Sequence, residues 1–257
     1  MKIAFWNIKL NKNFCYIVEL VKRVQADILF LAECPQENIT ELQNSYKVLA
    51  GKIYERPKIY SCIISETLGC SLIQEYKNRL FVYRLTFGKQ KLLVGVVHLI
   101  SKNHANPNTQ ITVSIDYMRE IREAYPKQDM ILIGDFNMNP FDHGMVSVAG
   151  FNSVCSEEIA LKEQRQFQME KYDYFFNPSW KNYSGIGNEV YGTYYHHSPD
   201  SDGFYWNNYD QVLLRPAILK KYNYKFTVLH NILNFDLRRK NNGISDHYPI
   251  LLELQEK

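Results

Sequence analysis

The 257-residue sequence is poor in cysteine, with five in all, and none of them forms a CxxC pair or a Cys/His cluster with zinc-site spacing. The odd count excludes a complete set of paired cysteines within one chain, as in small disulfide-stapled secreted domains. We therefore expect reduced, mostly buried thiols in a cytoplasmic protein at Cys15, Cys34, Cys62, Cys70 and Cys155.

Long apolar segments are also missing. No stretch approaches the roughly 18 consecutive apolar residues that a membrane-spanning helix needs. The opening residues, MKIAFWNIKLNKN, lack the apolar core and cleavage site of a signal peptide and instead indicate a strand. We expect a protein without a membrane partner, and no feature indicates an obligate protein partner.

The sequence has little excess charge of either sign. Its formal net charge is +3, which is compatible with an anionic substrate but far from the strong basic patch of a dedicated duplex-binding protein. The content of 46% hydrophobic and 22% charged residues is typical of a globular chain. No repeat, linker or low-complexity tract divides the chain, so we expect a single α/β domain over residues 1–257.

Apolar periodicity predicts the main elements. Short apolar runs at residues 27–33 and 129–136 are typical of strands buried on both faces. Helical spacing indicates helices around residues 14–21 and 109–125. Further strands are expected at residues 58–65, 79–87, 91–100, 208–216, 224–233 and 247–254. Residues 164–208 have weak periodicity, and we expect long loops with short elements there.

Polar residues stand at the ends of these expected strands. A carboxylate there is costly to bury unless it is paired or binds a metal. Any one of these residues alone fits a turn or a structural cap equally well. As a set they favour a shared site: Asn7, Glu33, His98, Asp135, Asn137, Asp210, Asp246 and His247.

The ordered segments FWNI, LAE, VVHLIS, IGDFNMNP, NNYDQVLL and SDHYPI resemble the motif set of the endonuclease/exonuclease/phosphatase superfamily, which has the deoxyribonuclease I-like fold. The resemblance runs from Asn7 to His247. It implies a four-layer α/β sandwich, with two packed mixed β-sheets flanked by helices and an active site at one edge. It also implies a magnesium-dependent hydrolase of phosphate esters, with manganese as an alternative metal.

The resemblance assigns a role to each motif residue. Glu33 is expected to bind the metal, with Asn7 beside it and Asp246 as a second or outer ligand. Asp135 is expected to orient the attacking water, and Asn7 and Asn137 to donate hydrogen bonds to the phosphate. The remaining catalytic residues are His247, its orienting partner Asp210, and His98 as a candidate general acid.

The sequence departs from the pattern at Lys9 and leaves the partner of His98 open. Apurinic endonucleases carry an aspartate two residues after the first asparagine, and here that place is Lys9. A phosphate-facing cation and an ordinary solvated lysine are both consistent with this. The acidic partner of His98 has no motif position, although Glu55 and Glu66 lie in the right region.

Two segments bear on the substrate. The cluster Arg238, Arg239 and Lys240 precedes the last motif, where it could bind phosphate or form a solvated loop. Residues 192–210 contain Tyr194, Tyr195, Tyr205, Trp206 and Tyr209, together with His196 and His197. These rings could stack on bases or simply pack on the core.

The leading interpretation is an endonuclease, exonuclease or related phosphodiesterase acting on nucleic acid. The alternative is a phosphatase or phosphodiesterase for a small or lipid phosphate ester, although no amphipathic membrane-docking helix is evident. A catalytically inactive binding module on the same fold is a third possibility, but it would predict lost motif residues, and all of them are present.

Overall fold

The computed structural model of the protein describes residues 1–53, 58–102, 104, 106–183, 191–196, 205–232, 235–236 and 244–257. Its helices are α1 (Cys15–Val24), α2 (Gln36–Gln43), α3 (Pro107–Ala124), α4 (His143–Val146), α5 (Glu157–Ala160), α6 (Pro216–Lys221) and the 3₁₀ helix η1 (Pro178–Tyr183). The strands of the first half are β1 (Lys2–Asn7), β2 (Ile28–Ala32), β3 (Lys47–Ala50), β4 (Ile59–Ile63), β5 (Leu68–Tyr76), β6 (Leu80–Phe87), β7 (Gln90–His98) and β8 (Met130–Asp135). The later strands are β9 (Ser153–Val154), β10 (Gln164–Phe167), β11 (Glu170–Asp173), β12 (Phe175–Phe176), β13 (Tyr194–Tyr195), β14 (Trp206–Asn207), β15 (Asp210–Leu214), β16 (Tyr222–Val228), β17 (Asn231–Ile232), β18 (Phe235–Asp236) and β19 (Ile250–Glu256).

Most of these strands belong to two mixed sheets. Within the described residues, one sheet has the order β16-β19-β1-β2-β4-β3 and the other the order β5-β6-β7-β8-β15-β12-β9. β1 and β2 run parallel, as do β7 and β8, while the other neighbours of these four strands are antiparallel. Each sheet therefore has a parallel pair near its centre.

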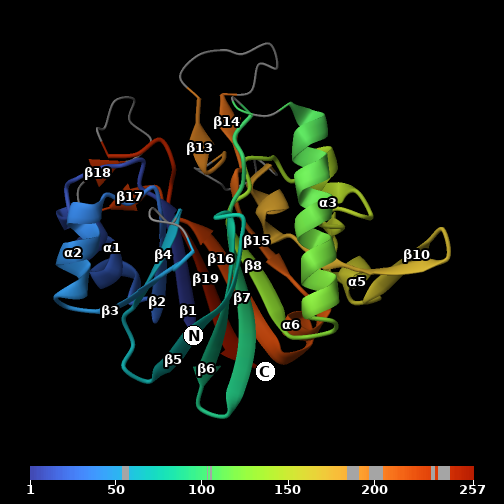
Figure 1. Ribbon diagram of the computed structural model, residues 1–257, viewed down its shortest axis with the longest axis horizontal. Coiled ribbons are helices and arrows are strands. Elements are labelled where there is room, and N and C mark those ends of the chain that lie inside the picture. The colour runs from blue at the N-terminus through green and yellow to red at the C-terminus, as the bar shows by residue number, and fades with distance from the viewer. Residues whose placement is uncertain are drawn as a thin grey trace.

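The two sheets pack face to face around a shared hydrophobic core. Phe5 and Phe30 of the first sheet meet Tyr83, Val94 and Ile133 of the second, and the Phe30 and Tyr83 ring centroids are 5.1 Å apart. On the outer faces, α1 and α2 cover the first sheet and α3 covers the second (Figure 1). The expected four-layer α/β sandwich is thus confirmed.

Most of the expected elements are present. The two long helices are α1 and α3, and the buried apolar runs are β2 and β8. The single strand expected over residues 224–233 is wrong: β16 pairs with β19, whereas β17 pairs with β18 in a separate ribbon. Residues 164–208 contain only short elements, as expected, including the β10–β11 hairpin that projects from the body in Figure 1.

The five cysteines are free thiols. Cys34 and Cys62 are buried and Cys70 is half-buried, and burial raises the pKa of each of these three thiols to about 12. Cys15 and Cys155 are exposed, so the expectation of mostly buried thiols is correct for three of the five. Among the described residues, no helix is both long and apolar enough to span a membrane.

Candidate active site

The sheet topology brings the expected site residues to one edge of the sandwich. Asn7 ends β1 and Glu33 follows β2 in the first sheet, while His98 ends β7 and Asp135 ends β8 in the second. His98 pairs in register with Asp135, and Asp210 pairs with Asp135 from the other side. Because residues opposite each other across strands are close neighbours, this register alone gathers these three side chains.

Asp135 lies at the centre of the group and is almost fully buried, with 1% of its surface exposed. Its Oδ1 accepts a hydrogen bond from the Asn137 backbone N–H at 2.9 Å, and its Oδ2 accepts one from Asn7 Nδ2 at 3.2 Å. The Nε2 atoms of His98 and His247 lie 3.8 and 4.0 Å from the same Oδ2. A single carboxylate oxygen therefore faces two imidazoles and an amide.

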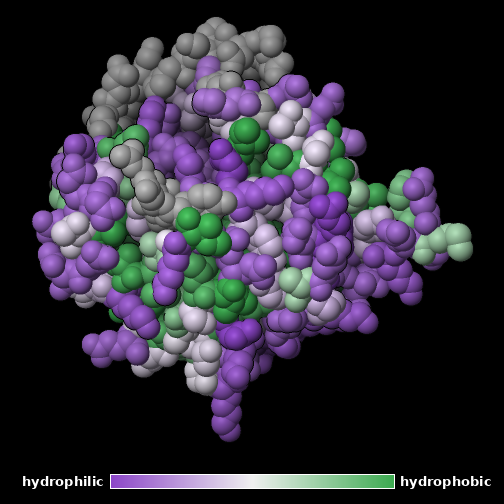
Figure 2. Space-filling view, in the orientation of Figure 1, coloured by the Kyte–Doolittle hydropathy of each residue, from purple (hydrophilic) through white to green (hydrophobic). Residues whose placement is uncertain are grey.

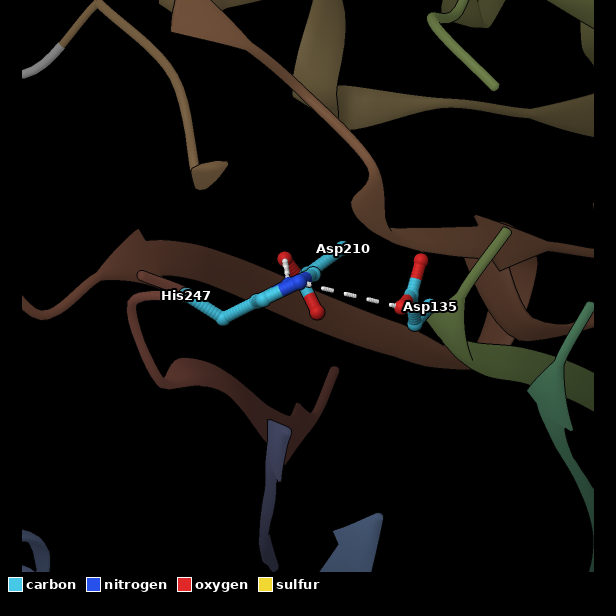
Figure 3. A group of neighbouring side chains, drawn as sticks. All are labelled: Asp135, Asp210 and His247. Atoms are coloured by element: carbon cyan, nitrogen blue, oxygen red, sulfur yellow. Dashed lines mark hydrogen bonds and ion pairs between the residues drawn. The ribbon is translucent and has the colours of Figure 1, made fainter. Parts of the chain in front are cut away.

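His247 is fixed from several directions. Its Nδ1 lies 2.9 Å from Asp210 Oδ2, and its ring lies between the carboxylates of Asp210 and Asp135 (Figure 3). Its backbone carbonyl accepts a hydrogen bond from Trp6 Nε1, and the Tyr194 ring centroid lies 4.7 Å from the imidazole. Burial by itself lowers the pKa of His247, but the charge and hydrogen bond of Asp210 outweigh it and raise the pKa.

Asp210 and His247 form a buried ion pair. Asp210 has no exposed surface, and its backbone N–H is bonded to Thr193 Oγ1 at 2.9 Å. Burial raises the pKa of the Asp210 carboxyl, and the nearby imidazole opposes that shift. The pair orients the His247 ring with Nδ1 toward Asp210 and Nε2 on the side of Asp135.

Glu33 and His98 form the second charged pair. His98 Nε2 lies 3.4 Å from Glu33 Oε1, and Asn7 Nδ2 donates to the same oxygen at 3.4 Å. The hydrogen bond from His98 lowers the pKa of Glu33 to about 2, although burial opposes it. The acidic neighbours of His98 are therefore Glu33 and Asp135, neither of which was expected as its partner. Of the two residues considered, Glu66 does not line the site cavity and Glu55 lies outside the described residues.

Two of these residues, Glu33 and Asn137, have left-handed backbone conformations, which set the directions of their side chains. Glu33 has φ of 49° and Asn137 has φ of 51°, which are uncommon for residues other than glycine. Such conformations persist only where the surrounding structure determines them, and they gather at functional sites. Asn137 is further held by the hydrogen bond from its Nδ2 to Leu99 O at 2.9 Å.

These residues open onto a cavity of about 620 Å³. Hydrophilic residues cover much of the visible surface in Figure 2, with hydrophobic residues in smaller patches between them. The lining includes every expected strand-end residue except Asp210, which lies behind His247. Tyr194, His196 and Tyr209 of the aromatic segment also line it, whereas Trp206 packs against Tyr248 at 5.4 Å.

Solved structures share the fold of this chain. Truncated TDP2 of Caenorhabditis elegans is 20% identical, covers 98% of this chain and 96% of its own, and has a TM-score of 0.59. TDP2 of D. rerio, complexed with a single strand DNA product, is 16% identical with 98% of each chain covered and a TM-score of 0.64. The 3′ phosphatase NExo from Neisseria, bound to a product DNA hairpin, is 16% identical with 99% of each chain covered and a TM-score of 0.60.

The chain has the endonuclease/exonuclease/phosphatase fold. No protein-family model matches the sequence, and no curated protein matches it either. The fold is therefore assigned from the structure, together with the ordered motifs. The sequence identity to these solved structures, 16–20%, is too low to transfer their functions to this chain.

Lys9 marks where this chain departs from the motif pattern of the fold. Its Nζ lies 2.5 Å from Asp246 Oδ2, and both residues line the cavity. Its backbone N–H also donates to Asn7 Oδ1 at 3.1 Å. With its oxygen accepting that bond, the Asn7 amide nitrogen faces Glu33 and Asp135, so the geometry favours Asn7 as a hydrogen-bond donor.

Two places in the site could hold a metal ion. Asp135, Asp210 and His247 offer ligand atoms within 4.8 Å of one another. Asp210 is fully buried, however, and its Oδ2 is bonded to His247, whereas Mg²⁺ keeps several of its waters. The Glu33 side chain is 35% exposed and lines the cavity, so its carboxylate fits magnesium better.

Several cationic residues of the cavity were not expected from the sequence. Lys58, Arg79 and Lys102 line it, together with His104. Arg79 directly precedes β6, whose first residue pairs with Val97 beside His98, and its Nη1 donates to the His98 carbonyl at 3.1 Å. The sequence could have indicated Arg79 only through its place at the start of an expected strand. The expected cluster Arg238, Arg239 and Lys240 lies outside the described residues, as does His197.

Proposed function

We propose that this chain is a magnesium-dependent hydrolase of nucleic-acid phosphoester bonds. The observation that carries the proposal is the convergence of Asp135, His98 and the Asp210–His247 pair on one cavity, with the Glu33 carboxylate at its wall. Phosphoester hydrolysis needs an oriented water, donors for the phosphate oxygens and help for the leaving oxygen, and these residues can supply all three.

Each residue takes a role that its contacts allow. Asp135 Oδ2 accepts hydrogen bonds and would orient the attacking water. His247, fixed through Nδ1 by Asp210, would donate from Nε2 to a phosphate oxygen. His98, whose Nε2 faces both Glu33 and Asp135, is placed to donate a proton to the leaving oxygen. Asn7 would add a further N–H donor, and Asn137 would fix the Asp135 carboxylate through its backbone N–H.

Glu33 is the residue that would hold magnesium. Hard oxygen donors suit this ion, and one carboxylate is a sufficient protein contribution because magnesium keeps several of its own waters. When bound, magnesium supplies positive charge to the non-bridging oxygens of the phosphate. Manganese accepts the same donors and would serve in its place.

Nucleic acid is the substrate class that the cavity supports best. The cavity lining includes four cations, Lys9, Lys58, Arg79 and Lys102, against three carboxylates. This excess of positive charge suits a polyanion. The Tyr194 and Tyr209 rings stack at 5.2 Å along its wall and offer a platform for a base. The D. rerio TDP2 and NExo structures named above contain DNA products, which favours the same class.

A substrate panel with and without metal tests this function. The panel contains single- and double-stranded DNA, RNA, abasic DNA, phosphotyrosyl-DNA, 3′-phosphorylated DNA, sphingomyelin and inositol phosphates, each with Mg²⁺, Mn²⁺ or EDTA. We expect turnover of a nucleic acid in Mg²⁺ and none in EDTA. Turnover restricted to the lipid or inositol substrates would contradict the proposed substrate, and undiminished activity in EDTA would contradict the metal dependence.

The variant Glu33→Gln tests the metal ligand. A neutral amide binds Mg²⁺ weakly, so we expect metal-dependent turnover to fall by on the order of a hundredfold or more while the circular dichroism spectrum is unchanged. Glu37→Gln is a matched control, because Glu37 lies in the first turn of α2, four residues after Glu33, and pairs with Lys12 at 3.0 Å, away from the cavity. Equal rates for the wild type and Glu33→Gln would remove Glu33 from the site.

A further inference from the structure

The turn after β1 fixes Lys9 relative to Glu33. Lys9 and Leu10 both have left-handed backbones, with φ of 51° and 55°. The Leu10 N–H donates to the Glu33 carbonyl at 2.8 Å, and the Lys9 N–H donates to Asn7 Oδ1 at 3.1 Å. Two consecutive non-glycine residues in this conformation are strained, and these bonds hold the turn against that strain. The position of Lys9 is therefore part of the built site.

The Lys9 side chain ends on a carboxylate of the same cavity. Its Nζ lies 2.5 Å from Asp246 Oδ2, and only 12% of the Asp246 side chain is exposed. The Lys9 side chain is 56% exposed, so the ammonium covers Asp246 on one side and meets the cavity on the other. An ammonium has three N–H donors, and the bond to Asp246 uses one of them.

This ion pair changes how many divalent cations the site can take. Glu33 and Asp246 both line the cavity, and two carboxylates in one phosphoesterase site could hold two metal ions. A divalent ion at Asp246 would have to displace Lys9 and would then lie close to its positive charge. Among the described residues, Glu33 in contrast forms its ion pair with the imidazole of His98 and not with a lysine or arginine.

We propose that Lys9 acts as a fixed cation in place of a second divalent ion, so that the site binds one divalent ion, at Glu33, while the Lys9 ammonium binds a phosphate oxygen of the substrate. The part concerning the phosphate rests on the proposed hydrolysis, and the part concerning metal number rests only on the proposed metal binding at Glu33. Lys9 would thereby be a substrate-binding residue whose charge needs no metal from solution.

Counting bound Mn²⁺ tests the metal number without any turnover. Free Mn²⁺ is measured by electron paramagnetic resonance during titration of the whole chain. We expect one Mn²⁺ for the wild type and two for Lys9→Asp, which replaces the ammonium by a third carboxylate. Lys12→Met is the control and should bind one, because Lys12 pairs with Glu37 and does not line the cavity. Two equivalent Mn²⁺ ions in the wild type, or one in a folded Lys9→Asp, would overturn the proposal.

Turnover of bis(p-nitrophenyl) phosphate tests the phosphate contact. Losing one donor to a reacting phosphate lowers kcat on the order of a hundredfold, and we expect a loss of that size for Lys9→Met but none for Lys12→Met. Lys9→Arg, which keeps the charge, should recover part of the rate. Wild-type turnover by Lys9→Met would refute the contact. If the wild type hydrolyses no phosphoester at all, the proposed function fails, and the Mn²⁺ count still decides the metal number.

Discussion

Asp210 and His247 depend on each other for stability as well as for position. A carboxylate without exposed surface is costly to ionise unless a hydrogen-bonded charge compensates it, and His247 Nδ1 is 2.9 Å from this one. Removing the imidazole leaves the effect of burial, which raises the pKa of Asp210, without its main opposing charge. The aspartate is then expected to hold its proton in the folded protein.

A double-mutant cycle tests this dependence. We expect His247→Ala to lower the free energy of unfolding by about 3–5 kcal/mol, because the buried Asp210 loses its charged partner and must take up a proton to stay buried. Adding Asp210→Asn should restore part of that loss, since asparagine is neutral without taking up a proton. In turnover, each single change should cost on the order of a hundredfold or more, and the double change much less than the product. Strict additivity in urea unfolding and in kcat/KM would show that the two residues act independently.

The pH dependence of His247→Ala follows from the same reasoning. A carboxyl whose pKa is raised in the folded state contributes a penalty that grows as pH rises above the pKa of the unfolded chain, about 4 for aspartate. Comparing His247→Ala with His247→Ala/Asp210→Asn isolates the carboxyl, because neither variant contains the imidazole, whose own raised pKa makes the wild type less stable as pH rises and would mask the effect of the carboxyl. The single variant should be less stable than the double variant by more at pH 8 than at pH 5. Urea unfolding at both pH values measures this difference, and a difference independent of pH would mean that Asp210 stays ionised.

At the residue scale, the strand-end residues could be predicted from the sequence because each one directly follows or ends an apolar run. Asn7, Glu33, His98 and Asp135 could be placed at one edge once each apolar run was taken as a strand. The contact between Lys9 and Asp246 could not be predicted, since it joins the two ends of the chain through side-chain geometry. Lys58, Arg79 and Lys102 stand in connections whose place depends on the order of strands in the sheets.

At the scale of elements, the β7–β8 pair is the frame that holds His98 beside Asp135. Gly134 makes the pairing possible: its φ is 142°, and a Cβ there would lie 2.1 Å from the Val97 carbonyl oxygen. We expect Gly134→Ala to lower the free energy of unfolding by at least about 3 kcal/mol, from backbone strain and steric overlap together. It should also reduce turnover, because Asp135 is the next residue. Urea unfolding and kcat measure the two effects.

Gly88→Ala is the control for that substitution. Gly88 has φ of 58° in the β6–β7 turn, and nothing lies within 4 Å of a Cβ placed there. Its replacement should cost about 1–2 kcal/mol for the left-handed backbone alone and leave turnover unchanged. Equal losses for the two variants would mean that the Val97 contact contributes nothing.

Elements with a clear apolar pattern were predicted, and those without one were not. β2 and β8 are buried at every residue, which their continuous apolar runs require. β5 was missed because it is an edge strand with mostly half-exposed residues, and a register shift between Leu72 and Gln74 interrupts its alternation. α2 was missed because only Asn38, Ile39 and Leu42 of its eight residues are buried, which leaves too weak a helical stripe.

At the scale of the whole molecule, cationic side chains lie at both ends of the sandwich. Lys9, Lys58, Arg79 and Lys102 line one cavity at the edge where the parallel strands end. Lys89 and Lys91 lie at the other end of the sandwich, beside the β6–β7 turn and a nine-residue strand away from His98. That strand spans about 30 Å, well beyond the Debye length of roughly 8 Å at physiological salt. Local charge rather than net charge should therefore govern the binding of a polyanion.

Salt dependence distinguishes the two groups of lysines. A nucleic acid releases counterions for each phosphate that a lysine neutralises, so log affinity for single-stranded DNA falls with log salt by about 0.7 per contact. We expect Lys58→Gln/Lys102→Gln to weaken binding and make this slope shallower. Lys89→Gln/Lys91→Gln lowers the net charge equally, from +3 to +1 because two lysines are removed, and should leave the slope unchanged.

The measurement is affinity at several salt concentrations, with turnover of bis(p-nitrophenyl) phosphate as a check on the catalytic residues. A small diester touches only the centre, so its turnover should be the same in both double variants. The cluster Arg238, Arg239 and Lys240 carries the same expectation from sequence and enters the same experiment as a triple alanine variant. Identical slopes for all variants would show that DNA does not contact these cations. Equal losses on DNA and on the small diester would place the damage at the catalytic residues instead.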